Sequence, residues 1–321
     1  MVSVQNLTKR YNSFKAVDNI SFELREGEIF GLLGPNGAGK TSTINMLTGI
    51  AHISGGSIRI GEKTYSSLVS EAKEIMGVIP DESNLYDDLD GFENLTFCGA
   101  LYGIPKKERE AKASYLLELF GLAEAGGKLF RAYSKGMKRK LTIAAGIIQS
   151  PKILFMDEPT TGIDVDSARQ IRKMIKELNN KGVTILLTTH YIEEAERLCH
   201  RIAFLVKGKI LRIDSVEELV KEAAGDFRIQ LTLSGYREEV EREFSSSFPQ
   251  FSLKVLDDSR ICIISPTLVS LAPIVKFFDD RGLVCYEAKR ILPSLEDVFV
   301  KITGIGSEMM KKEKEGKGIS V

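Results

Sequence analysis

Several features that would point to particular protein classes are missing from this chain. Its 44 Lys and Arg residues equal its 44 Asp and Glu residues, so the formal net charge is zero. The generally basic composition that is typical of nucleic-acid-binding domains is therefore absent, and we expect no direct contact with nucleic acid. One local basic cluster exists, although such clusters are usually solvated helix faces; it consists of Lys135, Lys138, Arg139 and Lys140.

Long apolar runs are also missing. No stretch approaches the ~18–20 apolar residues that a membrane-spanning helix needs. The segment Met1–Gln5 lacks the basic and apolar parts of a secretory signal, so none is expected. The cysteines show no CxxC spacing, which argues against a disulfide framework or a zinc ribbon; they are Cys98, Cys199, Cys262 and Cys285. These absences fit a reducing, cytosolic location.

The composition that remains is that of an ordinary globular protein. Hydrophobic residues make up 43% of the chain and charged residues 27%, which is enough to build a full core. A length of 321 residues suggests about two domains.

The most informative stretch is Gly34–Thr41, which fits the pattern G-x-x-x-x-G-K-[ST] of the phosphate-binding loop in nucleotide hydrolases. The run Glu28–Leu33 before it predicts a buried strand, and Thr41–Leu47 after it predicts a helix. Backbone N–H groups in such a glycine loop turn toward phosphate oxygens, and the helix dipole adds a favourable field. A glycine-rich turn that matches by chance is disfavoured, because the flanking strand and helix are both predicted.

A second part of the same site is predicted far downstream. The apolar run Ile153–Glu158 ends in two carboxylates, Asp157 and Glu158. Apolar runs suit a strand that is buried on both faces of a sheet. Charges at the carboxyl end of such a strand lie where open α/β sheets bind ligands. The acidic pair is weak evidence by itself, since many strands end in acidic turns, but it is strong when paired with the glycine loop.

Further segments occur in a fixed order around these two. Tyr11 precedes the first strands, Tyr133–Met137 lies just before the acidic strand, Thr161–Asp164 follows it, and His190 ends the apolar run Val183–Thr189. This order resembles the ATP-binding-cassette (ABC) ATPases over roughly the first two-thirds of the chain.

The segment Tyr133–Met137 resembles a variant of the LSGGQ signature of that family. Ser134 and Gly136 match the signature, whereas Tyr133, Lys135 and Met137 depart from it. Among ABC ATPases, the chain is most similar to the ATP-binding subunits of drug- and sodium-exporter type, which carry a C-terminal extension.

The resemblance implies an α/β fold. It predicts a P-loop NTPase core with an antiparallel β subdomain and a helical subdomain, followed by a small α+β (ferredoxin-like) C-terminal domain. The predicted boundaries are 1–214 for the ABC ATPase domain, about 86–150 for its helical subdomain, and 215–304 for the C-terminal domain. The apolar segments after 215 follow a β-α-β-β-α-β order, which suits that last assignment. Residues 305–321 are charged and poor in apolar side chains, so we predict a disordered tail.

The resemblance also assigns roles to individual residues. Tyr11 would stack on adenine with Val17 packing nearby. Glu158 would be the general base, His190 would contact the γ-phosphate and the attacking water, and Lys40 would reach the β- and γ-phosphates. The remaining phosphate-binding residues would be Gly34, Asn36, Gly37, Gly39, Thr41 and Ser42.

Three further residues would act on a second nucleotide. In ABC ATPases two cassettes meet head-to-tail, and each ATP lies between the phosphate loop of one chain and the signature segment of the other. Ser134 and Gly136 would therefore bind the nucleotide of the partner, and Asp164 would communicate across the interface.

Magnesium is the expected cofactor beside ATP. Thr41 would ligate Mg²⁺ directly and Asp157 would hold its coordination shell. Where the family usually has glutamine after the strand Ile75–Pro80, this chain has Asp81. A third carboxylate beside Asp157 and Glu158 raises at least one pKa unless a metal neutralises it. Asp81 would either ligate Mg²⁺ or turn toward the partner, and the sequence leaves both open.

The predicted function is that of an ATPase subunit of an ABC transporter. It would form a homodimer or pair with another ATPase subunit, and would act at the cytoplasmic face of the membrane on a multi-span permease subunit; an exporter is the expected type. The main alternative is a soluble ABC ATPase that acts on ribosomes or DNA, which usually has tandem cassettes or a long coiled coil between its motifs. A nucleotide-binding regulator without turnover is a third option, disfavoured by Glu158 and His190.

Overall fold

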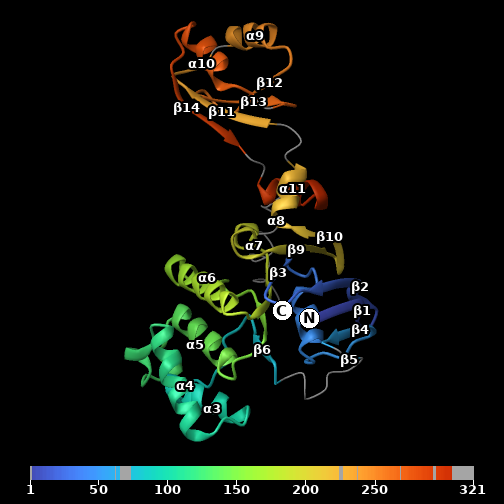
Figure 1. The fold of residues 1–321 in the computed structure, drawn as a ribbon, viewed down its shortest axis with the longest axis vertical. Helices are drawn as coiled ribbons and strands as arrows, with labels where there is room; N and C mark the ends of the chain where they lie inside the picture. The colour runs from blue at the N-terminus through green and yellow to red at the C-terminus, as the bar shows by residue number, and fades with distance from the viewer. Residues whose placement is uncertain are drawn as a thin grey trace, which may run out of the picture. The chain divides into compact units, whose positions relative to one another are not determined.

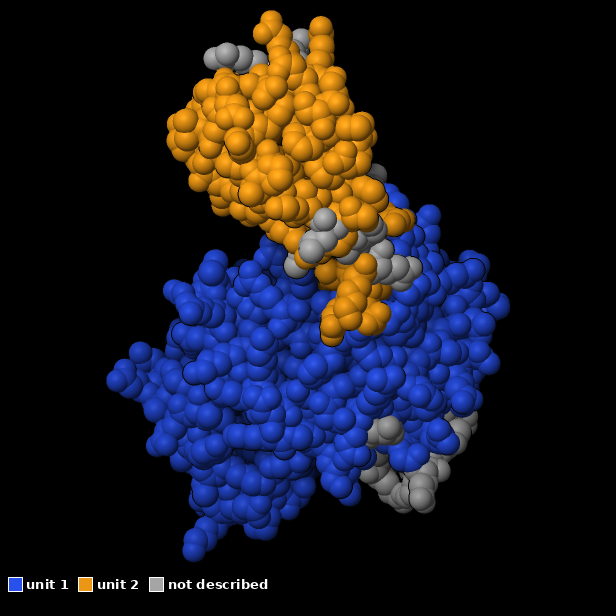
Figure 2. All heavy atoms as spheres, turned by 45° about the horizontal axis from the view of Figure 1, so that its top comes forward, with its two compact units in different colours: residues 1–216, 302–321 blue, residues 217–301 orange. Residues whose placement is uncertain are grey.

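The computed structural model describes residues 2–61, 63–65, 74–223, 227–236, 238–267, 269–291 and 294–305. Its residues group into two compact units, one of Met1–Val216 with the segment from Ile302 onward, and one of Glu217–Lys301 (Figure 2). The predicted domain boundary lies at 214/215. The predicted tail, apart from residue 305, lies outside the described residues.

The first unit contains a six-stranded sheet in the order β10-β9-β3-β8-β7-β6 (Figure 1). All neighbouring strands are parallel except that β10 pairs antiparallel with β9. Every residue of β3, β7 and β8 is buried, as is typical of strands covered on both faces. The carboxyl ends of these three strands meet at one edge, where ligands of open α/β sheets bind. The strands are β3 (Ile29–Leu33), β6 (Met76–Ile79), β7 (Ile153–Asp157), β8 (Thr184–Thr189), β9 (Arg201–Val206) and β10 (Lys209–Ser215).

A second, four-stranded sheet has the order β2-β1-β4-β5, and its described pairs are antiparallel. Tyr11 ends strand β1 (Val2–Tyr11) and Phe14 begins strand β2 (Phe14–Leu24). Strands β4 (Gly55–Ile60) and β5 (Lys63–Tyr65) complete the sheet. A hydrophobic core joins the two sheets, and within it the rings of Phe22 and Phe30 stack with centroids 5.4 Å apart.

Three helices of the first unit begin at polar residues whose side chains cap them. Asp90 and Glu93 form a capping box at the start of α3, and Ser134 and Asp164 are the N-caps of α5 and α6. Figure 1 shows α3, α4 and α5 on one side of the large sheet and the antiparallel sheet on the other. The bounds are α1 (Lys40–Leu47), α3 (Gly91–Leu101), α4 (Lys106–Leu119), η1 (Ala123–Ala125), η2 (Phe130–Ala132), α5 (Lys135–Ile147), α6 (Val165–Asn180) and α7 (Ile192–Leu198). Across the described residues, every helix is too short or too polar to cross a bilayer.

The C-terminal part of the chain contains an antiparallel sheet in the order β12-β13-β11-β14. Its element order is β-α-β-β-α-β, in agreement with the predicted order, and the ferredoxin-like class stays a prediction. Phe244 on α9 packs against Phe277 and Phe278 on α10. The sequence did not locate α9, because its glutamates and serines leave few apolar positions. The bounds are α8 (Val216–Ala223), β11 (Phe227–Leu233), α9 (Glu238–Ser247), β12 (Ser252–Val255), β13 (Arg260–Ser265), α10 (Leu271–Asp279), β14 (Cys285–Ile291) and α11 (Leu295–Thr303).

Candidate functional site

The glycine loop between β3 and α1 takes a shape that larger residues cannot adopt. Gly39 has φ 104°, and a Cβ there would lie 2.4 Å from the carbonyl oxygen of Ala16. A Cβ on Gly34 would lie 2.0 Å from the carbonyl oxygen of Leu205. Both contacts are with backbone, which cannot move aside, so only glycine fits. The loop is thereby fixed against its neighbours, and its end presents the N-terminus of α1, a favourable place for an anion.

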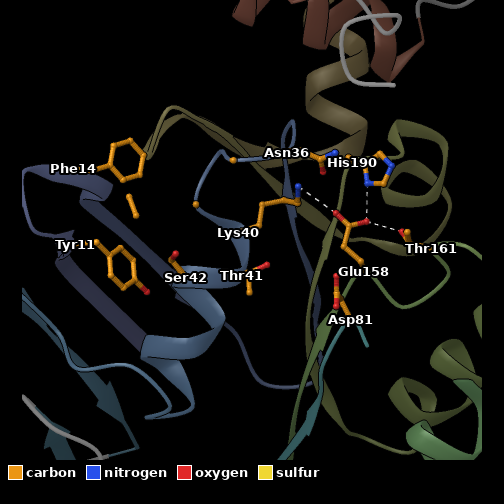
Figure 3. A pocket seen from close by; sticks show the side chains of 13 residues that line it. Tyr11, Phe14, Asn36, Lys40, Thr41, Ser42, Asp81, Glu158, Thr161 and His190 are labelled. Carbon is orange, nitrogen blue, oxygen red and sulfur yellow. Dashed lines mark hydrogen bonds and ion pairs between the residues drawn. The ribbon is translucent and has the colours of Figure 1, made fainter. Parts of the chain in front are cut away.

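A pocket of about 370 Å³ opens beside this loop, between the antiparallel sheet and the carboxyl edge of the large sheet (Figure 3). Aromatic side chains stand at one end and charged side chains at the other. Its volume falls in the range of small-molecule sites. The residues that line it are Tyr11, Phe14, Ala16, Asn36, Gly37, Gly39, Lys40, Thr41, Ser42, Asp81, Glu158, Thr161 and His190.

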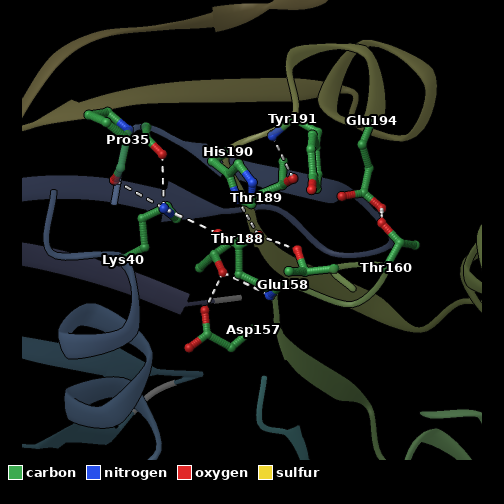
Figure 4. A network of polar contacts seen from close by, with 12 residues as sticks. Pro35, Lys40, Asp157, Glu158, Thr160, Thr188, Thr189, His190, Tyr191 and Glu194 are labelled. Atoms are coloured by element: carbon green, nitrogen blue, oxygen red, sulfur yellow. Dashed lines mark hydrogen bonds and ion pairs between the residues drawn. The ribbon is translucent and has the colours of Figure 1, made fainter. Parts of the chain in front are cut away.

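Glu158 lies at the centre of the charged end. One carboxylate oxygen, Oε1, is 3.2 Å from Nζ of Lys40. The other, Oε2, is 2.7 Å from Nδ1 of His190 and accepts a hydrogen bond of 2.8 Å from the Thr161 hydroxyl. Figures 3 and 4 show these side chains turned toward one another. Three residues from separate parts of the chain therefore orient one carboxylate.

The same contacts set the charge state of Glu158. Burial raises its pKa, but the hydrogen bond with His190, the charge of Lys40 and the Thr161 hydroxyl outweigh burial and lower the pKa to about 2. The carboxylate is therefore ionised at neutral pH. Lys40 also donates to the carbonyl oxygens of Gly34 at 2.8 Å and Pro35 at 3.1 Å.

The backbone at Glu158 is unusual for a residue with a side chain. Its φ is 48°, in the left-handed region that favours glycine. Its N–H donates to the carbonyl oxygen of Thr188 at 3.2 Å and to the hydroxyl of Thr188 at 3.1 Å. Strained residues of this kind persist where the surroundings hold them, and they concentrate at functional sites.

Asp157 lies directly before Glu158, at the end of β7, and is almost fully buried. Its Oδ1 accepts a hydrogen bond from the Thr188 hydroxyl (Figure 4). Strand β8 brings Thr188 opposite Asp157 in the parallel register. Asp157 does not line the pocket wall itself.

Asp81 follows β6 and does line the pocket. Burial raises its pKa first, the negative charges of Asp157 and Glu82 raise it further, and Arg139 opposes them. The negative charge of Glu158 also raises the pKa of Asp81, so both downstream carboxylates act on it.

The fold and these motifs match a known family. Residues 17–161 match the family described as ABC transporter. The linearmycin resistance ATP-binding protein of Bacillus subtilis (strain 168) is 41% identical, over 74% of this chain and 76% of that protein. The daunorubicin resistance ATP-binding protein of Streptomyces coeruleorubidus is 32% identical, over 94% of this chain and 96% of that protein. The chain belongs to the ABC transporter ATP-binding proteins.

Solved structures agree with this assignment. A dimeric ATP-binding cassette in a post-hydrolysis state, bound to ADP and Pi, superposes with a TM-score of 0.62 at 25% identity, over 67% of this chain and 98% of that one. An ATP-binding subunit of an ABC transporter gives a TM-score of 0.62 at 27% identity, over 69% and 92%. The family resemblance and the P-loop fold predicted from the sequence are confirmed, and the protein is an ATPase.

Some predicted site residues do not line the pocket of this ABC ATPase. Val17, which was predicted to pack near the base, is buried and does not line the pocket itself, but its Cγ2 would lie 3.3 Å from a Cβ on Gly39, which does line it. Ser134, Gly136 and Asp164 also do not line it. A Cβ on Gly136 would lie 2.2 Å from Oγ of Ser167 and 3.1 Å from Oδ2 of Asp164, so the starts of α5 and α6 pack closely.

Other residues of the ABC site escaped the sequence analysis. Phe14 lines the aromatic end of the pocket and is 63% exposed. The sequence feature that could have indicated it is its position two residues after the turn at Asn12. Thr188 contacts Asp157, but threonine is too common for sequence to single it out. Thr161 belongs to the predicted segment Thr161–Asp164, but its contact with Glu158 was not predicted. Arg139, expected on a solvated helix face, is instead buried.

Proposed function

We propose that this chain is the ATP-hydrolysing subunit of an ABC transporter, which works as a head-to-tail dimer and drives a separate membrane subunit of an exporter. The observation that carries this proposal is the convergence of Lys40, His190 and Thr161 on the carboxylate of Glu158, beside the glycine loop. The names of the relatives, which concern linearmycin and daunorubicin resistance, support export as the direction.

ATP would lie along the pocket, with its base at the aromatic end. Tyr11, which is 46% exposed at the end of β1, would stack on adenine. The phosphates would meet the N–H groups of the glycine loop at the start of α1. Lys40 would exchange its contacts with the loop carbonyls for the β- and γ-phosphates. The other phosphate-binding residues in this proposal are Gly34, Asn36, Gly37, Gly39, Thr41 and Ser42.

Glu158 would take the proton of the attacking water, since it is the carboxylate held in the pocket by fixed contacts. A base with a pKa near 2 is weak. When Lys40 contacts the phosphates, its charge is shared with them, so the pKa of Glu158 rises and the base becomes stronger. His190, within hydrogen-bond distance of Oε2, would orient the carboxylate and contact the γ-phosphate.

The donor set also fits magnesium. Mg²⁺ in phosphate sites uses one or two carboxylates, a hydroxyl and phosphate oxygens, and keeps several waters. Thr41 lines the pocket, Asp157 lies at the adjacent strand end with Oδ1 held by Thr188, and Asp81 adds a third oxygen source. These three residues would hold the ion. Bound Mg²⁺ would neutralise charge that develops on the phosphates.

The dimer would complete each site from a second chain. Ser134 caps α5, so the positive end of that helix dipole lies at the signature segment. Ser134 and Gly136 do not line the pocket of their own chain, and Gly136 packs beside Asp164. In a head-to-tail pair they would face the γ-phosphate of the partner. ATP would favour the closed dimer, and hydrolysis would open it.

The helical part of the first unit offers a surface for the membrane subunit. Aromatic and aliphatic side chains are exposed on and beside α3, and the ring centroids of Tyr86 and Phe97 lie 5.0 Å apart. Exposed apolar groups of this kind mark interaction sites. Here they adjoin the segment Asp81–Phe92, which we expect to line the docking cleft. The exposed residues are Tyr86, Phe97, Leu101 and Tyr102. Docking there would place the protein at the cytoplasmic face of the membrane.

Two measurements test the proposal. Calorimetry on Lys40→Ala should show loss of ATP binding without loss of fold, because the charge contact with the phosphates is gone; unchanged affinity would refute the phosphate-loop assignment.

Leu101→Glu should abolish co-purification with a multi-span membrane protein that is co-expressed with the chain. Ile50→Glu, at another exposed position of the first unit, should not. Co-purification with ribosomes or DNA in place of a membrane protein would favour the soluble alternative.

A further inference from the structure

Arg139 does not lie on a solvated helix face, although the sequence places it in a basic cluster. It sits in the second turn of α5 and only 3% of its surface is exposed. Its neighbours in the sequence, Lys138 and Lys140, are only partly buried. A buried arginine needs partners for its whole guanidinium group, because burying an unsatisfied charge is costly.

All five N–H groups of this guanidinium reach backbone carbonyls. Nε donates to Pro159 at 2.8 Å, and Nη2 donates to Asp157 at 2.8 Å and to Glu158 at 3.2 Å. Nη1 donates to Asp81 at 3.1 Å and to Pro80. The acceptors belong to two segments only, the one that follows β6 and the one that ends β7.

Carboxylates surround the guanidinium without touching it. Within the described parts of the chain, no ion pair joins Arg139 to an acidic side chain. Burial lowers the pKa of Arg139 to about 10, while Asp81, Asp157, Glu194 and Glu158 oppose that shift. The group therefore stays charged at neutral pH, and its charge partly offsets the rise in the pKa of Asp81. Its direct contacts serve the backbone that carries the acidic side chains.

We propose that Arg139 is a positioning residue that fixes the ends of β6 and β7, and so holds Asp81, Asp157 and Glu158 in their places for ATP hydrolysis. The inference rests on the proposed function, which gives these carboxylates their roles. It deepens that function, because α5 also carries Ser134 at its N-cap. The helix that would sense the partner's nucleotide is thereby bonded directly to the backbone of the carboxylates of its own chain.

The positioning is tested first without any reference to catalysis. Hydrogen exchange in segments 79–82 and 157–161 should rise by about tenfold in Arg139→Gln and also in Arg139→Lys, because neither side chain reaches both segments. Lys140→Gln removes a positive charge from the same helix and is the matched control, with exchange like that of the wild type. If Arg139→Gln does not fold, hydrogen exchange in Arg139→Lys, which keeps the charge, tests the proposal. Wild-type exchange in both segments of a folded variant would overturn the proposal.

The rate of ATP hydrolysis measures how the loss of this positioning affects catalysis. A displacement of about 1 Å costs up to about 100-fold in rate, so kcat should fall by tenfold or more in folded Arg139→Lys, while KM for ATP stays within about threefold. A kcat like that of the wild type in both Arg139 variants would refute the proposal. If Glu158→Gln kept full turnover, the proposed function would be refuted instead. Hydrogen exchange would still show whether Arg139 holds the two segments in place.

Discussion

Nδ1 of His190 lies 2.7 Å from Oε2 of Glu158, while the other carboxylate oxygen lies 3.2 Å from Nζ of Lys40. One side chain thus connects the phosphate loop with the residue that follows β8. The position of Glu158 depends on both ends of this bridge, and the consequences for catalysis, stability and assembly are measurable.

Glu158→Gln should bind MgATP normally but hydrolyse it about 10²–10⁴ times more slowly, because glutamine keeps the size of the side chain but cannot accept the proton. Since hydrolysis opens the dimer, the variant should accumulate as an ATP-bound dimer. Turnover and sedimentation with MgATP measure both effects. Asp81→Asn is the comparison variant, because Asp81 is the other carboxylate that lines the pocket and could act as the base. If Asp81→Asn loses turnover and Glu158→Gln does not, the base has been assigned to the wrong carboxylate.

The acid stability of the chain should depend on Glu158. Its pKa is lower in the folded chain, about 2, than the ordinary value of 4.5, so its stabilising contribution is present above pH ~4.5 and is lost as the pH falls toward 2. The difference corresponds to about 3 kcal/mol of unfolding free energy. Glu158→Gln does not titrate. Urea unfolding at pH 6 and pH 2.5 should therefore show a smaller acid loss in the variant, and equal losses in both chains would contradict the assigned contacts.

Ser134→Arg should block ATP-driven dimerisation and leave ATP binding by the single chain nearly unchanged. Ser134 lies outside the pocket of its own chain and would face the nucleotide of the partner, where an arginine is too large. Sedimentation with ATP and Mg²⁺, together with calorimetry, separates the two effects. Normal dimer formation by the variant would count against the head-to-tail arrangement.

The aromatic end of the pocket should bind the base and not the phosphates. Tyr11→Ala and Phe14→Ala should each weaken ATP binding, and loss of stacking is typically worth about 1–3 kcal/mol per base. Affinity for inorganic triphosphate, which lacks a base, should be unchanged and is the internal control. A variant that loses affinity for both ligands to the same degree would show that its aromatic ring supports the loop and does not contact the base.

Local features of the sequence were sufficient for much of this protein. The glycine loop was identified from Gly34–Thr41 because a left-handed turn and close backbone contacts demand glycine at set positions. The N-caps of α5 and α6, Ser134 and Asp164, are of residue types that favour helix starts, since N-capping needs only a polar side chain before a helical pattern. Buried strands such as β7 were identified from their continuous apolar runs.

Tertiary structure decided the relations between distant residues. Strand β8 lies between β3 and β7, and that order brings Lys40, Glu158 and His190 together although long stretches of chain separate them. The tertiary structure also buries Arg139, which the sequence places in a basic cluster, and bonds it to the ends of two strands. It places Phe14 at the pocket and buries Val17 in the core. No local pattern predicts such contacts, because they depend on which strands pair and on how the whole core packs.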